Sequence, residues 1–102
     1  MNNWVIAGYT CSDHAQKRMQ QRGIRKESVE AVLMHGDKRS HQGGDAVAIF
    51  VSKRAGGQLV NDRVITPALL ERLVNLVVLT AEGIIVTTFP RKGGRLRRGE
   101  PA

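Results

Sequence analysis

Three side chains suited to phosphodiester chemistry, those of His14, Arg18 and Arg22, follow one another at intervals of four residues. We call them the His-Arg row. RNA cleavage without a metal ion needs a base for the 2′-hydroxyl proton, a cation for the phosphorane and an acid for the leaving oxygen. Histidine titrates near neutral pH and suits either proton transfer, and arginine matches phosphate oxygens with paired hydrogen bonds. The row is therefore a candidate catalytic site of a metal-independent endoribonuclease.

The same row has a structural interpretation that the spacing leaves open. Arg18 and Arg22 can pair with acids such as Glu27 or Glu30, and His14 can be an ordinary residue at the border of the core. Many helices carry a histidine and two arginines at this spacing without any chemical role.

Other combinations of reactive side chains are weaker. Cys11, His14, His35 and His41 could be metal ligands, but their spacing matches no zinc pattern, so we expect no metal and no other cofactor. A nucleophilic pair of Cys11 with His14 has no accompanying signature. The hydroxyls of Thr87 and Thr88 either face a phosphate or belong to an ordinary strand surface.

The His-Arg row is predicted to lie on a helix over residues 13–22. Ser12 or Thr10 is a suitable N-cap, and Gly23 is a suitable left-handed stop. Steps of four residues turn by about 40° around a helix, so the row occupies one narrow face.

The neighbouring stripe of Ala15 and Met19 is apolar and should face the core. We therefore expect His14 and at least one of the two arginines to face a cleft beside a sheet.

The remaining pattern predicts an α+β fold with two N-terminal helices packed on a small antiparallel sheet. A second helix is expected over 26–35, ended by Gly36, and a short helix is expected to begin at Thr66 and Pro67. The expected strands are 46–52, 75–80 and 84–89, with an edge strand or strap at 4–9, a turn-rich segment at 36–45 and a loop at 53–57. One long strand over 73–79 is an alternative to the short helix and hairpin.

Positive charge points to a polyanionic partner. The chain has 16 Lys and Arg against 9 Asp and Glu, a net charge of +7. We expect RNA, or alternatively DNA, to bind two basic patches and one basic loop; a solvated basic surface without a partner is the alternative. The residues expected to contact nucleic acid are Lys17, Arg25, Lys26, Lys53, Arg54, Arg91, Lys92, Arg95, Arg97 and Arg98.

The bulk composition sets the class of protein. A length of 102 residues predicts one domain, over 1–90, followed by a basic disordered tail over 91–102. A single cysteine excludes an internal disulfide, and no segment has the length of a signal peptide or membrane span. The expected location is the cytoplasm, with no membrane partner.

The segments HAQKRMQQRGI and VEAVLMHG, followed by GDAVAIFVSKR and VVLTAEGIIVTTF, resemble a family of small bacterial domains of unknown function. That family is marked by the motif H-A-x2-R-M-x2-R-G-I and is similar to the RelE and BrnT-type toxins of the barnase/EndoU/colicin/RelE-like fold. The resemblance covers about residues 12–90. This chain departs from the pattern in its long segment between strands, RAGGQLVNDRVITPALLERL, and in its arginine-rich tail.

The resemblance implies a RelE-like fold, RNA as substrate, and His14, Arg18, Arg22 and Thr88 as site residues. It also implies a toxin-like activity with an antitoxin protein as partner. A nucleic-acid-binding module without catalysis, or an adaptor for an acidic protein, is the alternative function.

Overall fold

A computed structural model describes residues 4–90 of the chain. These residues form four helices and one six-stranded mixed sheet, so the α+β class is confirmed. In chain order the elements are β1 (Val5–Ile6), β2 (Tyr9–Cys11), α1 (Asp13–Arg22), α2 (Lys26–His35), β3 (Lys38–Gly43), β4 (Ala46–Phe50), α3 (Lys53–Asn61), α4 (Pro67–Leu73), β5 (Leu76–Ala81) and β6 (Ile84–Pro90).

The sheet has the strand order β1-β2-β6-β5-β4-β3. The strands β3 to β6 pair antiparallel, as expected for the three predicted strands, and β5 and β6 form a hairpin. A wholly antiparallel sheet was the wrong prediction, because β2 pairs with β6 in parallel. This pairing places the start of α1 beside β6, a strand more than 70 residues later in the chain.

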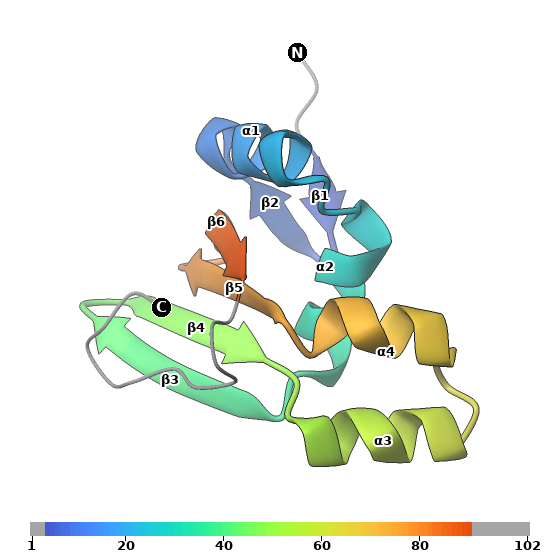
Figure 1. Ribbon diagram of the computed structural model, residues 1–102. Coiled ribbons are helices and arrows are strands. Elements are labelled where there is room, and N and C mark those ends of the chain that lie inside the picture. The colour runs from blue at the N-terminus through green and yellow to red at the C-terminus, as the bar shows by residue number, and fades with distance from the viewer. Residues whose placement is uncertain (1–3, 91–102) are drawn as a thin grey trace.

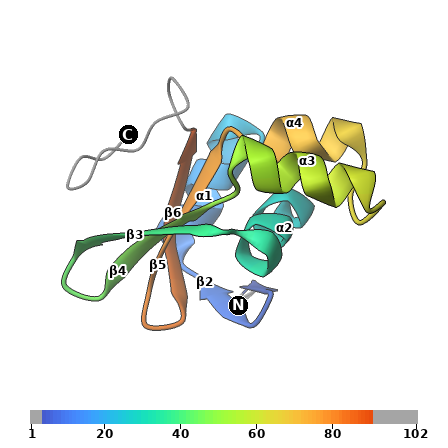
Figure 2. The same ribbon diagram turned by 90° about the horizontal axis from the view of Figure 1, so that it is seen from below.

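All four helices lie on one side of the curved sheet (Figures 1 and 2). The core between the two layers is built from Met19 of α1, Val29 and Val32 of α2, and Ile49 and Val78 of the sheet, all buried. Ala15 and Met19 both face this core, as the apolar stripe predicted.

Two segments expected to be irregular are regular, whereas the short helix and hairpin expected after Thr66 are confirmed and their alternative, one long strand over 73–79, is wrong. The turn-rich segment contains β3, an edge strand with no buried residue, which is why no apolar alternation marks it. The expected loop at 53–57 is the start of α3, where Ser52 caps the helix by accepting a hydrogen bond from the Ala55 N–H. Leu73 ends α4, and β5 begins only at Leu76.

The expected helix ends are confirmed. Ser12 and Thr66 cap α1 and α4, and Pro67 occupies the first turn of α4. Gly23 follows α1 with a φ of 65°, the left-handed conformation that glycine adopts at little cost. Within residues 4–90, no helix is long and apolar enough to cross a membrane. The tail over 91–102 lies outside the described residues.

Candidate nucleic-acid interface

The first turn of α1 is tied to β6. The Ser12 hydroxyl accepts a hydrogen bond from the Ala15 N–H and donates one to the Val86 carbonyl, each at 3.1 Å. The Ser12 N–H also donates to the Ile85 carbonyl at 3.1 Å. The hairpin register shifts at this point, so that Val86 has no partner residue in β5. The N-cap of α1 therefore uses a carbonyl that a β-bulge makes available.

The last turn of α1 is tied to the same strand by Arg22. Its Nη1 donates a 2.6 Å hydrogen bond to the carbonyl oxygen of Thr88. Pairing of Arg22 with Glu27 or Glu30, the structural alternative of the sequence, is therefore wrong for the described residues, in which Glu27 instead contacts Arg25 at 3.6 Å. Both ends of α1 are held on β6, which fixes the direction of its outer face.

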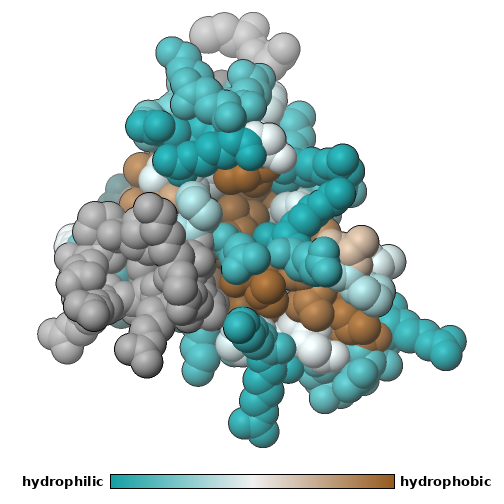
Figure 3. Space-filling model, in the orientation of Figure 1, coloured by the Kyte–Doolittle hydropathy of each residue, from teal (hydrophilic) through white to brown (hydrophobic). Residues whose placement is uncertain are grey.

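The outer face of α1 carries the rest of the His-Arg row and one further cation. His14 and Lys17 are exposed and Arg18 is half-buried. Within residues 4–90, none of the three forms a salt bridge or a side-chain hydrogen bond. Hydrophilic side chains cover α1 in the space-filling view (Figure 3). This face is an open surface with uncompensated positive charge.

The row does not converge on one point. His14 and Arg22 are eight residues apart, which corresponds to about 12 Å along a helix. A pocket of about 400 Å³ lies at the Arg22 end, and neither His14 nor Arg18 lines it. The structure thus places the imidazole on the open face and one guanidinium at a pocket.

Thr88 is brought close to Arg22 only through its backbone. Its side chain faces the core, opposite Val78, and has no exposed surface. The Oγ1 atom of Thr88 has no hydrogen-bond partner among the described residues. Thr87 pairs with Leu79 and is half-buried. In this conformation the Thr88 hydroxyl does not meet solvent.

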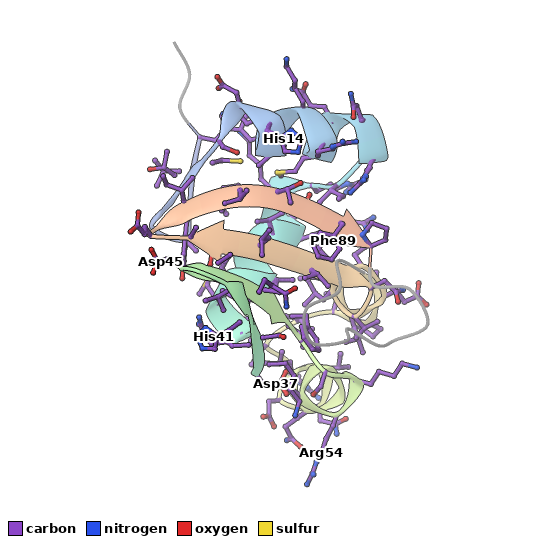
Figure 4. All side chains as sticks on the ribbon, turned by 90° about the vertical axis from the view of Figure 1, so that its left-hand side faces the viewer. His14, Asp37, His41, Asp45, Arg54 and Phe89 are labelled. Atoms are coloured by element: carbon purple, nitrogen blue, oxygen red, sulfur yellow. The ribbon has the colours of Figure 1, made fainter. Side chains whose placement is uncertain are left out.

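The other basic residues fall into separate groups. Arg25 and Lys26 are exposed at the start of α2, where the Lys26 ammonium lies 4.0 Å from the centre of the Trp4 ring. Lys53 and Arg54, expected in a loop, are exposed in the first turn of α3. Figure 4 shows Arg54 at the opposite end of the molecule from His14. The tail residues lie outside the described part, namely Arg91, Lys92, Arg95, Arg97 and Arg98.

The potential metal ligands do not form a cluster. In the described part of the chain, no three His, Cys, Asp or Glu side chains are placed to hold one ion. Burial raises the pKa of the Cys11 thiol, an effect that the nearby positive charge of Lys26 only partly offsets. A thiol with a raised pKa is a poor nucleophile near neutral pH.

The pocket near Arg22 is the feature that sequence reasoning missed. Its walls come from the α1–α2 connection, the end of α4, the start of β5 and the end of β6. Arg25 was expected to bind nucleic acid, but nothing in the sequence indicated that Arg72 and Ser28 lie beside it. Only the tertiary fold joins these segments.

Comparison with known proteins identifies the family of the chain, and the function of that family is unknown. Residues 11–90 match the model of the family described as a domain of unknown function, DUF4258. No curated protein and no solved structure matches the chain significantly.

Proposed function

We propose that this chain, which belongs to the DUF4258 family of domains of unknown function, binds RNA through its phosphate backbone. The outer face of α1 is the contact surface, with Lys17 and Arg18 as its principal cations. Arg22, Arg25 and Lys26 extend the positive charge toward the start of α2.

The observation that supports this proposal is the lack of charge compensation on α1. Lys17 and Arg18 have no carboxylate partner within residues 4–90, although the chain offers Asp13 one turn away from Lys17. Cations left unpaired on a fixed helix face attract phosphates. When the phosphates bind, the counterions condensed on the nucleic acid are released. The chain has few aromatic residues for stacking on bases, so the contacts should be mainly to the backbone.

A second candidate function is cleavage of the bound RNA, in the manner of the RelE and BrnT-type toxins that the sequence resembles. The observation that favours it is the exposed imidazole of His14, four residues before Arg18 on the same face. In this proposal His14 removes the 2′-hydroxyl proton as the 2′-oxygen bonds to phosphorus, and the imidazolium so formed gives a proton to the departing 5′-oxygen. Arg18 stabilises charge on the phosphorane, and no metal ion takes part. A small acidic antitoxin protein would then cover the face of α1.

Binding is tested with the purified full chain and a fluorescently labelled single-stranded RNA over a range of salt concentrations. We expect the double variant K17Q/R18Q to weaken binding and to reduce the slope of log K against log salt by roughly 1 to 1.5. The double variant K38Q/R39Q removes the same charge from exposed positions of the edge strand β3, outside the expected contact residues, and is the matched control. Equal effects of the two variants would remove α1 as the contact surface.

Cleavage is tested by incubating the same RNA with the protein in EDTA and analysing the product ends. The second candidate requires cyclic phosphate ends and a loss of at least about a hundredfold in rate for H14A. If wild type and H14A bind RNA equally and both leave it intact, the chain is a binding module and not a nuclease.

A further inference from the structure

The pocket beside Arg22 combines positive charge with an apolar wall. Three arginines line it, Arg22, Arg25 and Arg72, against one carboxylate, Glu71. One N–H group of Arg22 donates to the Thr88 carbonyl oxygen. At the surface, Nη1 of Arg25 lies 3.6 Å from Oε1 of Glu27. The side chain of Arg72 has no hydrogen bond or ion pair within the described part of the chain. Donors for an anion therefore remain available in this pocket.

The start of α2 forms one side of the same pocket. This helix has ten residues, and its N-cap residue, Arg25, makes no side-chain capping hydrogen bond. The first N–H groups of a helix lack intrahelical acceptors and carry partial positive charge, which favours a bound anion.

A second, independent observation comes from Ser28 in the first turn of α2. Ser28 lines the pocket, is only 3% exposed, and its Oγ has no hydrogen-bond partner within residues 4–90. A buried hydroxyl without a hydrogen-bond partner has a cost in folding free energy, because its lost hydration is not replaced. The Oγ atom has almost no exposed surface in this conformation, so the Ser28 side chain must turn toward the pocket to donate to an acceptor oxygen there, and that hydrogen bond would remove the cost.

We propose that this pocket binds the phosphomonoester group of a nucleotide. The phosphate lies at the start of α2, where it accepts hydrogen bonds from Ser28 and from the guanidinium of Arg72. The nucleoside lies against Ile24, Leu76 and Pro90, which form the apolar part of the wall. A volume of about 400 Å³ is within the usual range for small-molecule sites.

The phosphomonoester has two sources, a free mononucleotide and the 5′-phosphorylated end of an RNA strand. This inference goes beyond RNA backbone binding by α1, because a mononucleotide need not touch the outer face of that helix. The two proposals can therefore fail separately.

The test titrates the full chain with adenosine 5′-monophosphate, adenosine and inorganic phosphate by calorimetry. In parallel, one RNA sequence is compared with a 5′-phosphate and with a 5′-hydroxyl. Two variants alter the pocket, S28A and R72Q, and R39Q removes one exposed charge from β3 as the matched control. S28A removes a hydroxyl that has no partner, so its thermal midpoint should equal or exceed that of wild type.

We expect the monophosphate, the 5′-phosphorylated RNA or both to bind more tightly than their partners without the phosphomonoester. S28A and R72Q should each weaken that binding about tenfold, and R39Q should not. A preference confined to the RNA end identifies the strand as the source, and a response to the free nucleotide identifies the small molecule. The proposal is overturned if neither probe shows the preference, if R39Q has the same effect as R72Q, or if inorganic phosphate binds as tightly as the nucleotide.

Discussion

The Arg22 guanidinium and the Thr88 carbonyl oxygen are joined by a 2.6 Å hydrogen bond that connects α1 to β6 across 66 residues of sequence. Arg22 belongs to the row that the spacing assigned to phosphate chemistry, yet part of its donor capacity holds the fold together. Arg22 also lines the pocket at the α1–α2 connection, and its guanidinium has four further N–H donors. Arg22 should therefore affect stability as well as binding, whereas Arg18 should affect binding alone.

Replacement of Arg22 separates these two roles. Arg22→Ala should lower the free energy of unfolding by about 1–2 kcal/mol, because the Thr88 carbonyl loses its charged donor. Arg18→Ala is the matched control and should change it by less than about 0.5 kcal/mol, because Arg18 has no partner within residues 4–90. Urea unfolding measures both values. Equal effects would show that the hydrogen bond does not stabilise α1.

Thr88→Val tests whether the buried hydroxyl belongs to the fold or to a reaction. Valine has nearly the same shape, and Oγ1 of Thr88 is buried without a partner in the described residues. The substitution should raise the free energy of unfolding by about 1 kcal/mol and leave RNA binding unchanged. Thr88→Ala, which leaves a small cavity, should instead destabilise the protein. Loss of an RNA-cleaving activity in a more stable Thr88→Val protein would assign the hydroxyl to the reaction.

Local signals predicted the elements that local physics determines. The caps Ser12 and Thr66 and the stop at Gly23 are encoded within a few residues of each helix end. The apolar stripe of Ala15 and Met19 set the buried side of α1 for the same reason. The hairpin of β5 and β6 also follows from two apolar runs around a short turn.

The features that the sequence did not predict depend on contacts between segments far apart in the chain. The parallel contact of β2 with β6 joins Cys11 to Ile85, and a strand of three residues carries too little pattern to indicate such a partner. The pocket at Arg22 depends on α4 reaching the start of α2, which periodicity cannot express. The spacing identified the row itself, but only the tertiary fold buries the Thr88 hydroxyl away from it and places Arg22 alone of the row at the pocket.

The two adjacent glycines of α3 should respond in opposite directions. A Cβ at Gly56 would lie 2.3 Å from Leu70 Cδ1, whereas a Cβ at Gly57 would meet no atom within 4 Å. Gly56→Ala should therefore destabilise the protein by about 1 kcal/mol, because the Leu70 side chain must shift out of its place between α3 and α4. Gly57→Ala should stabilise it by about 0.5–1 kcal/mol, because alanine favours the helix.

Thermal and urea unfolding of the two single variants measure this contrast, and each serves as the control for the other. Destabilisation by both would mean that alanine is unfavourable throughout α3. Stabilisation by both would mean that the Leu70 side chain gives way to the new Cβ at little cost.

The contact of Asp37 with Ser52 should make stability depend on pH in the acid range. Burial by itself raises the pKa of Asp37, but hydrogen bonds from the Ser52 N–H and hydroxyl, each at 2.7 Å, outweigh it and hold that pKa below its ordinary value. The unfolded chain therefore takes up the proton first as pH falls. The stabilising contribution is complete above the unfolded pKa, about 4, and is lost as pH falls through the folded pKa.

Asp37→Asn should lower the free energy of unfolding at pH 7 and flatten its decline between pH 5 and the acid limit, because this carboxylate no longer titrates. The same hydrogen bonds position Ser52, the N-cap of α3, so the first turn of that helix should lose amide protection in hydrogen exchange. Asp45→Asn is the control, since Asp45 is exposed and its side chain has no hydrogen bond or ion pair in the described part of the chain. An unchanged acid profile for Asp37→Asn would show that this carboxylate does not couple the loop before β3 to the start of α3.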